Sequence, residues 1–303
     1  MTELTAFQRK ISTFLPEIEI KMSESMSKHT SFRIGGEAEV MAFPKTAEEL
    51  AKLLSAAKES GVRPVILGAG TNVLAPDEGM KGLVICLKDC LSGMEQLDEN
   101  HVRIHAGVSM ARAANFAAGL GLSGLEFAHG IPGTVGGGVF MNAGAYGGEI
   151  CQVCKQVSVM DFDGNQKLLS NEEVGFSYRN SGIQRENLIV LFADFELKPQ
   201  PEVSIREKMM ELMAKRRASQ PLDLPSAGSA FKRPATGYAA AMIDQAGLKG
   251  FQIGGAAVSE KHAGFVVNLG GATAADVRAL LEAVAERVEE IHGVRLEPEV
   301  RIW

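Results

Sequence analysis

GIPGTVGGGVFMNAGAYGG, residues 130–148, holds eight of the chain's 33 glycines within nineteen residues. The glycines are flanked by bulky apolar side chains such as Val135, Val139, Phe140 and Met141, whereas flexible linkers are polar and rich in Gly and Ser. The apolar residues can anchor the segment in a core while the glycines leave the backbone bare for a ligand. A tightly turned, buried loop is the alternative, and composition alone leaves both interpretations open.

The composition describes an ordinary globular protein. The chain has 303 residues, of which 46% are hydrophobic and 22% charged, and this length is sufficient for two or three domains. A net charge of -6 gives no overall attraction to nucleic acid or to an anionic membrane. The N-terminal residues lack the apolar core of a signal peptide, and no apolar run is long enough to span a bilayer. We therefore expect a cytoplasmic location, with no nucleic acid or membrane partner.

The four cysteines and six histidines do not form a metal-binding pattern. Cys151 and Cys154 make a CxxC motif, but Cys86 and Cys90 have a different spacing, and no histidine follows at the distance of a zinc finger. We expect no metal site, and interpret these cysteines as small apolar core residues.

The first part of the chain predicts an α/β unit. Thr46 and Glu49 form a capping box before a helix that ends at Gly61, and strands are expected over 62–67 and 83–87. Between the strands, GAGTN at 68–72 lacks the third glycine of the dinucleotide fingerprint and the Lys of a P-loop. A Rossmann domain is therefore disfavoured, and a nest of amides that holds a diphosphate remains.

The rest of the chain predicts strands and then helices. Strands are expected over 102–106, 157–161 and 188–197, with a helix over 110–120 and a turn at 163–164. Pro199 and Pro201 indicate a boundary, and a helix capped by Ser204 follows. A long helix begins at Thr273 and ends at Gly293.

Three polar residues stand in apolar or glycine-rich surroundings: Arg179 in SYRNS, Ser229 in GSAFKRP and Glu299 in LEPEVRIW. Taken singly, each has an ordinary explanation, as a loop arginine, a turn serine and a surface ion pair with Arg301. Ser229 also lacks the GxSxG context of a hydrolase nucleophile. These residues are candidates on their context alone.

Seven motifs in the same order resemble the UDP-N-acetylenolpyruvoylglucosamine reductase family over nearly the whole chain. They are HTSFRIGG at 29–36, ILGAGTNVL at 66–74, GIPGTVGG at 130–137, NAGAYGGEI at 142–150, SYRNS at 177–181, GSAFKRP at 228–234 and LEPEVRIW at 296–303. The resemblance implies an α+β fold: a two-part FAD-binding region of the vanillyl-alcohol-oxidase type, residues 1–87 and 88–198, and a C-terminal α/β substrate-binding domain, residues 199–303. The absence of a tyrosine-bearing loop between Tyr178 and Lys198 places the chain with the shorter subtype.

The resemblance also implies an activity. The family's enzymes use NADPH and FAD to reduce the enolpyruvyl ether of UDP-N-acetylglucosamine-enolpyruvate to UDP-N-acetylmuramate in peptidoglycan synthesis. The positions that match its catalytic residues are Arg179, Ser229 and Glu299, with Ser229 as proton donor, Arg179 polarising the substrate carboxylate and Glu299 stabilising the enolic form. We expect a monomer.

The resemblance assigns the cofactor and substrate contacts as follows. Residues expected to line FAD are Gly68, Ala69, Gly70, Thr71, Asn72, Gly130, Ile131, Pro132, Gly133, Gly136, Gly137, Asn142, Ala143, Gly144 and Ala145. Residues expected to contact substrate are Tyr146, Arg217, Gln220, Lys232 and Arg301. The family often reads FKNP where this chain has FKRP, so an amide contact from position 233 is in doubt.

Two other functions are compatible with the motifs. A flavin oxidase of the same fold would share the FAD domains but lack the three catalytic residues and react with oxygen. A non-catalytic nucleotide-sugar-binding module would bind its ligand without a coloured cofactor.

Overall fold

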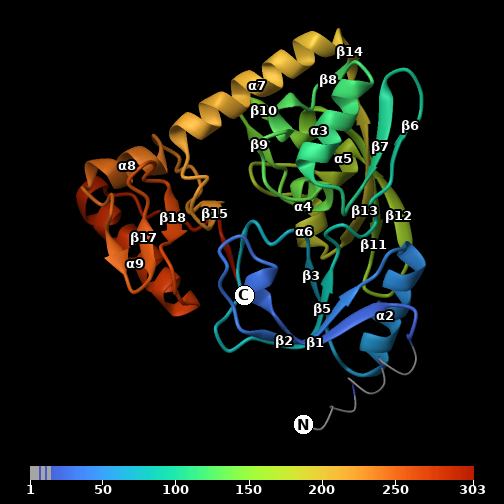
Figure 1. Cartoon of the computed structure of the whole chain (residues 1–303), viewed down its shortest axis with the longest axis horizontal. Coiled ribbons are helices and arrows are strands. Elements are labelled where there is room, and N and C mark those ends of the chain that lie inside the picture. Colours follow the sequence, from blue (N-terminus) through green and yellow to red (C-terminus); the bar gives the residue numbers. More distant parts are fainter. Residues whose placement is uncertain (1–6, 8–10, 12–14) are drawn as a thin grey trace. The chain divides into compact units, whose positions relative to one another are not determined.

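The computed structural model describes residues 7, 11 and 15–303, and its contacts divide the chain into two compact units (Figure 1). The first unit holds the described residues up to Met22 together with Val40–Ala69 and Gly82–Ala214. The second holds Ser23–Glu39, Gly70–Lys81 and Lys215–Trp303. Two segments from the first third of the chain therefore belong to the same unit as the C-terminus. The three-part division expected from sequence stays a prediction.

A sheet in the order β1-β2-β5-β3, in which β3 and β5 are parallel, shares its core with the amphipathic helix α2. Its elements are β1 (Glu19–Ser25), β2 (Glu37–Phe43), α2 (Ala47–Glu59), β3 (Val65–Leu67) and β5 (Met80–Cys86). The Thr46 half of the predicted capping box is confirmed, because the Thr46 hydroxyl accepts a hydrogen bond from the Glu49 amide, whereas the Glu49 carboxylate accepts from the Lys45 amide. The first strand expected here is shorter than predicted: it begins at Val65, after Pro64, which has no N–H to donate.

The larger sheet of the first unit is antiparallel, in the order β12-β11-β13-β7-β6. Its strands are β6 (Met94–Gln96), β7 (His101–His105), β11 (Cys154–Met160), β12 (Gln166–Ser170) and β13 (Ile189–Glu196). The elements around it are α3 (Met110–Gly119), β8 (Leu122–Ser123), α4 (Val135–Phe140), β9 (Gly144–Ala145), β10 (Gly148–Glu149), α5 (Asn171–Val174), α6 (Gly182–Arg185) and β14 (Lys198–Pro199), with short 3-10 turns at Glu126–Ala128 and Ile150–Gln152. In Figure 1, α3 and α4 lie beside β7 and β13, with which they share a core.

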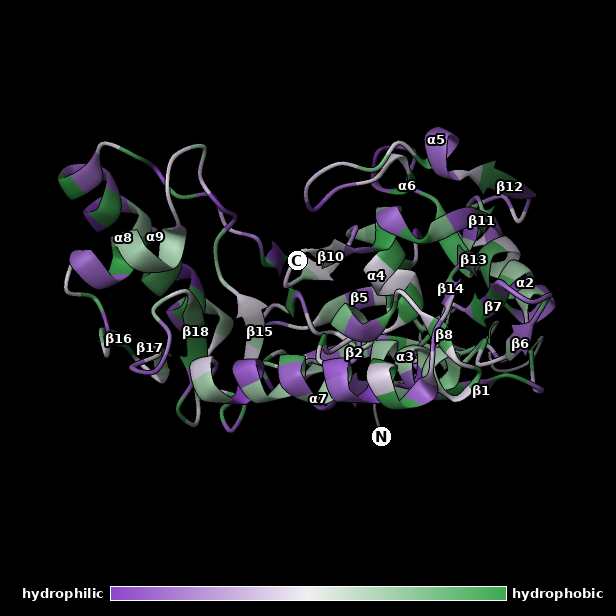
Figure 2. Cartoon of the chain, turned by 90° about the horizontal axis from the view of Figure 1, so that it is seen from above, coloured by the Kyte–Doolittle hydropathy of each residue, from purple (hydrophilic) through white to green (hydrophobic). Residues whose placement is uncertain are grey.

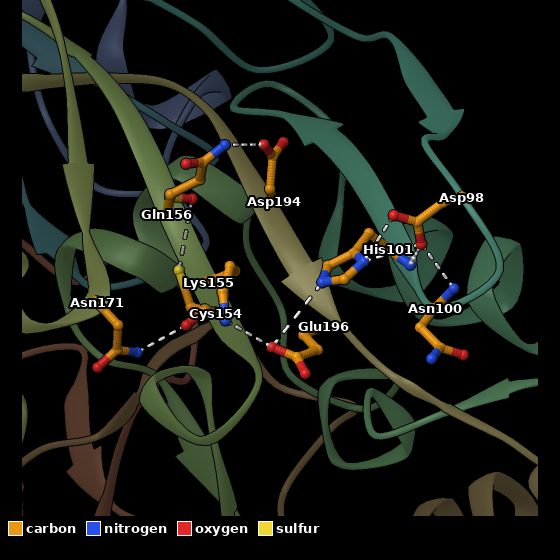
Figure 3. A network of polar contacts seen from close by, with 9 residues as sticks. All are labelled: Asp98, Asn100, His101, Cys154, Lys155, Gln156, Asn171, Asp194 and Glu196. Atoms are coloured by element: carbon orange, nitrogen blue, oxygen red, sulfur yellow. Dashed lines mark hydrogen bonds and ion pairs between the residues drawn. The ribbon is translucent and has the colours of Figure 1, made fainter.

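Cys154 of the CxxC motif belongs to this core (Figure 3), whereas Cys151 is only half-buried. Cys154 is buried on β11, and its backbone carbonyl accepts a 2.7 Å hydrogen bond from the Asn171 amide. Burial, with nearby Asp194, raises the pKa of the Cys154 thiol to about 12, so the thiol stays protonated at neutral pH. Among the described residues, no group of three or more His, Cys, Asp or Glu side chains is arranged to hold a metal ion.

Helix α7 (Glu202–Ser219) begins two residues before Ser204, the predicted cap. The prediction of a Ser204 cap is wrong, because the amides of Ser204 and Ile205 both donate to the Pro201 carbonyl. The helix is hydrophilic over much of its surface (Figure 2), and its buried residues are Ile205, Met209 and Leu212. No helix in the described part of the chain is both long and apolar enough to cross a bilayer.

The second unit has an antiparallel sheet in the order β15-β18-β17-β16, with helices packed on it. Its elements are β4 (Val73–Leu74), β15 (Ser226–Ser229), α8 (Ala239–Gln245), β16 (Gln252–Ile253), β17 (Ala256–Val258), β18 (Phe265–Asn268), α9 (Ala274–His292) and β19 (Arg301–Ile302), with a 3-10 turn at Met26–Lys28. The predicted long helix is confirmed as α9, with a Thr273–Asp276 capping box and a left-handed Gly293 after its end.

Side-chain hydrogen bonds hold residues 23–39 and 70–81 within this unit. The Ser31 hydroxyl donates to the Ser226 carbonyl at 2.6 Å, and the Asn268 amide donates to the Phe32 carbonyl at 2.9 Å. The Asp77 carboxylate accepts from the amides of Ala274 and Ala275, at the start of α9. These long-range bonds explain why early segments of the chain belong with its C-terminus.

Candidate active site

Gly68 and Thr134, which come from two glycine motifs far apart in the sequence, both belong to the first unit and lie in contact. Gly68 follows β3, and a Cβ placed on it would lie 2.8 Å from Oγ1 of Thr134. Thr134 is buried and caps α4, since its Oγ1 accepts a 3.3 Å hydrogen bond from the Gly137 amide. The GAGTN and GIPGTVGG motifs are therefore in direct contact, and glycine is required at position 68 for that contact.

The glycines of α4 have different roles. A Cβ on Gly136 would lie 2.8 Å from Ala106 Cβ, and one on Gly138 would lie 2.8 Å from Met110 Sδ, so both allow close packing of the helix. Gly137 is exposed, and its nearest neighbour would be at an ordinary contact distance of 3.5 Å. Sequence alone predicted neither α4 nor the role of Thr134 as its cap. A Thr before an apolar residue is an N-cap signal that identifies it.

The NAGAYGG segment forms a small hairpin in which β9 pairs with β10. Tyr146 and Gly147, at its tip, have φ values of 55° and 86°, as a two-residue hairpin turn requires. Tyrosine rarely adopts this conformation, and Tyr146 is also exposed. Asn142 is buried at the base of the hairpin, where its side chain bonds Glu149, the Ser177 carbonyl and the Cys151 amide. The Asn142 side chain therefore holds the hairpin in place.

Arg179 is attached to this hairpin. Its guanidinium donates to the Gly144 carbonyl at 3.1 Å and to the Asn142 carbonyl at 3.5 Å, and it lies over the Tyr178 ring. Its φ of 53° is unusual for a residue other than glycine. The structure thus joins the first candidate catalytic residue to the glycine-rich segment.

Ser229 and Glu299 come together in the second unit. Ser229 is exposed at the end of β15, after Gly228 with a φ of 78°. The next residue, Ala230, accepts a 2.9 Å hydrogen bond from the Glu299 amide through its carbonyl. Phe231 and Pro298 form an antiparallel bridge beside this bond. The two candidates therefore lie on neighbouring, hydrogen-bonded segments that are about 70 residues apart in sequence.

The expected substrate contacts are distributed through the chain. Lys232 makes a 3.1 Å ion pair with Glu297 next to the Ser229–Glu299 segments, and Arg301 is exposed on β19. The Arg217 carbonyl accepts from Lys261, and the Gln220 amide donates to the Arg216 carbonyl at the end of α7. Arg233 lies over the exposed Tyr238 ring at 4.2 Å.

The residues of the glycine motifs fit a dinucleotide cofactor. Residues 68–72 and 130–137 contain no acidic side chain that would repel a diphosphate, and they offer backbone amides, threonine hydroxyls and one asparagine amide. At Gly68 a side chain would fill the space in front of Thr134. Bare backbone and neutral donors are the chemistry that a diphosphate requires.

Comparison with known proteins identifies the family. The chain is 45% identical to the UDP-N-acetylenolpyruvoylglucosamine reductase of Latilactobacillus sakei, over 100% of this chain and 98% of the relative. The chain belongs to the UDP-N-acetylenolpyruvoylglucosamine reductase family. The enzyme of the same name from Lactobacillus acidophilus is 47% identical, over 94% of this chain and 95% of the relative.

Domain and structure comparisons agree with this assignment. Residues 38–170 match the FAD binding domain, and residues 220–303 match the C-terminal domain of UDP-N-acetylenolpyruvoylglucosamine reductase. The crystal structure of the Thermus caldophilus reductase superposes with a TM-score of 0.78 at 34% identity, covering 94% of this chain and 98% of that one. The α+β fold, with an FAD-binding region followed by a C-terminal domain, is confirmed.

Proposed function

We infer that this chain is an NADPH-dependent flavoenzyme with UDP-N-acetylmuramate dehydrogenase activity, acting in the synthesis of peptidoglycan precursors. The observation that carries this conclusion is the similarity of the entire chain to reductases of one family, at about 45% identity. Its substrate is the enolpyruvyl ether of UDP-N-acetylglucosamine, and NADPH is its reductant. The cytoplasmic location and the monomeric state stay predictions from sequence.

When bound, FAD supplies the hydride-transfer chemistry. Gly68 of the first glycine motif and Gly137 of the second are the residues that we propose to hold its diphosphate. Support comes from the contact between Gly68 and Thr134, which brings the two motifs together, and from the neutral donors on both.

The three candidate catalytic residues meet different demands of this reaction. Reduction of an enolpyruvyl ether creates negative charge next to the carboxylate, and that charge needs a cation and then a proton. Arg179 supplies the cation, and the Ser229 hydroxyl donates the proton to the α-carbon. Glu299 holds the enolic form in place. The hydrogen bond that joins Glu299 to Ala230 supports a common task for Ser229 and Glu299.

The test separates the two half-reactions. The purified protein should be yellow and lose its flavin absorbance when NADPH is added, and the enolpyruvyl substrate should restore the absorbance without oxygen. Ser229→Ala should keep the bleaching by NADPH and slow the second step about 10²- to 10⁴-fold, as loss of a general acid does. Ser226→Ala, at the other end of β15, is the matched control and should leave both steps unchanged.

Other outcomes distinguish the alternatives. Equal loss of both half-reactions in Ser229→Ala would rule out the proton-donor role. Rapid reoxidation by oxygen, with no response to the enolpyruvyl substrate, would indicate an oxidase. A colourless protein that binds UDP-sugar would indicate a binding module.

A further inference from the structure

We propose that Asn72 is a positioning residue for Glu299, which it holds in register with Ser229. This inference rests on the function proposed above for Glu299. The sequence placed Asn72 among the expected cofactor contacts, and the structure adds a role in the catalytic half of the chain.

Asn72 bonds to the backbone on both sides of Val300. Its side-chain amide donates to the Glu299 carbonyl at 3.1 Å, and its own carbonyl accepts from the Arg301 amide at 3.0 Å. Val300 is buried in a bend, whereas Glu299 is half-buried and Arg301 is exposed. Asn72 therefore fixes the short segment from which both charged side chains project.

The Glu299 backbone is held from two sides. Its amide donates to the Ala230 carbonyl, next to Ser229, while its carbonyl accepts from Asn72. The first bond sets the distance to the Ser229 strand, and the second prevents the segment from rotating about that bond. Together they determine the position of the Glu299 carboxylate relative to the Ser229 hydroxyl.

Among the described hydrogen bonds between these two segments, the bond from the Asn72 side chain is the one that depends on residue type. After residue 72 the two segments continue as a parallel pair, with Val73 opposite Arg301 and Leu74 opposite Ile302, and the Trp303 amide donates to the Leu74 carbonyl. Those bonds are between backbones and do not depend on residue type. At Glu299 the donor is a side chain, so its identity determines whether the bond forms.

Only some residues at position 72 preserve the bond. Alanine removes the donor, and aspartate at neutral pH replaces it with a carboxylate oxygen that faces the Glu299 carbonyl. A protonated aspartic acid regains an O–H donor of nearly the same size and shape. An Asn72→Asp enzyme should therefore recover function on acidification, which a purely structural role would not produce.

The segment offers a matched control. Asp77 anchors the same stretch, residues 70–81, through its bonds to the amides of Ala274 and Ala275, and it makes these bonds without touching Glu299. Asp77→Ala should lower the melting temperature and leave both half-reactions at their normal rates.

The experiment measures flavin content, bleaching by NADPH and anaerobic reoxidation by the enolpyruvyl substrate, from about pH 4 to pH 8. Measured per bound flavin, Asn72→Ala should keep its bleaching rate and slow reoxidation about tenfold, as expected for one lost hydrogen bond. Asn72→Asp should be slower than Asn72→Ala at pH 8 and approach it, or exceed it, at about pH 4, where the carboxyl group gains its proton.

Glu299→Gln separates the two hypotheses. If Glu299→Gln leaves reoxidation unchanged, the proposed function of Glu299 is wrong. If Glu299→Gln slows reoxidation, the double variant Asn72→Ala/Glu299→Gln should be no slower than Glu299→Gln alone. Positioning by Asn72 is overturned if the two effects multiply, if the Asn72 variants slow bleaching per bound flavin as much as they slow reoxidation, or if Asn72→Asp shows the pH profile of the normal enzyme.

Discussion

Replacing Gly68 with alanine should disturb the contact between the two glycine motifs. The new Cβ would lie 2.8 Å from Oγ1 of Thr134, closer than a Cβ atom approaches another heavy atom in folded proteins, and the stiff Thr side chain has to rotate away. Rotation breaks the cap on the Gly137 amide, worth about 1 kcal/mol, and leaves a buried hydroxyl without its partner, at about 1–3 kcal/mol. We expect the free energy of unfolding to fall by about 2–4 kcal/mol.

A double variant identifies the cause of this loss. Thr134→Ala alone should cost about 1 kcal/mol, because it removes the same cap. In Gly68→Ala/Thr134→Ala the two Cβ atoms are 4.0 Å apart, an ordinary contact, so the double variant should be no less stable than Thr134→Ala. The two substitutions should therefore couple by about 2 kcal/mol or more.

Urea and thermal unfolding of the enzyme measure these differences, at roughly 2–4 °C of melting temperature for each kcal/mol. Gly119→Ala is the matched control, because a Cβ there meets nothing within 4 Å. The flavin bound per protein chain provides the functional measurement, and it should fall in Gly68→Ala. Additive effects of the two substitutions, or a Gly68→Ala enzyme as stable as the Gly119→Ala control, would refute the contact between the motifs.

Two further predictions concern charged and titrating groups. Arg103→Leu removes the 2.7 Å and 2.9 Å hydrogen bonds to the buried Asp194 carboxylate, and should lower the free energy of unfolding in urea by about 3–5 kcal/mol. The double variant Arg103→Leu/Asp194→Asn should recover most of this loss. A loss below about 1 kcal/mol in Arg103→Leu would contradict the prediction. Burial lowers the pKa of His262 below 6.5, so the unfolded chain binds a proton more readily, and stability falls as the pH drops below about 6.5. His262→Gln should make this fall shallower in melting temperatures measured between about pH 7 and 5, and an unchanged slope would exclude the effect.

Elements with local signals were predicted well from sequence. The Thr46 and Thr273 caps and the Gly293 stop determined two helices, because a cap involves residues only three or four positions apart. The strand at 62–67 was overestimated because Pro64 interrupts the pairing, and α7 begins earlier because Pro201 provides its first acceptor. Helix α4 was missed, since three of its six residues are glycines, which disfavour a helix in isolation.

By itself, the sequence determined the α+β class, the family, the FAD-dependent chemistry and the three candidate catalytic residues, because each rests on short motifs in a characteristic order. The tertiary structure alone decided which residues meet. Gly68 contacts Thr134, Arg179 bonds the Asn142–Gly144 hairpin, and Asn72 bonds Glu299. These contacts join residues tens to hundreds of positions apart, and they form through backbone carbonyls and missing Cβ atoms, which leave no periodic pattern in a sequence.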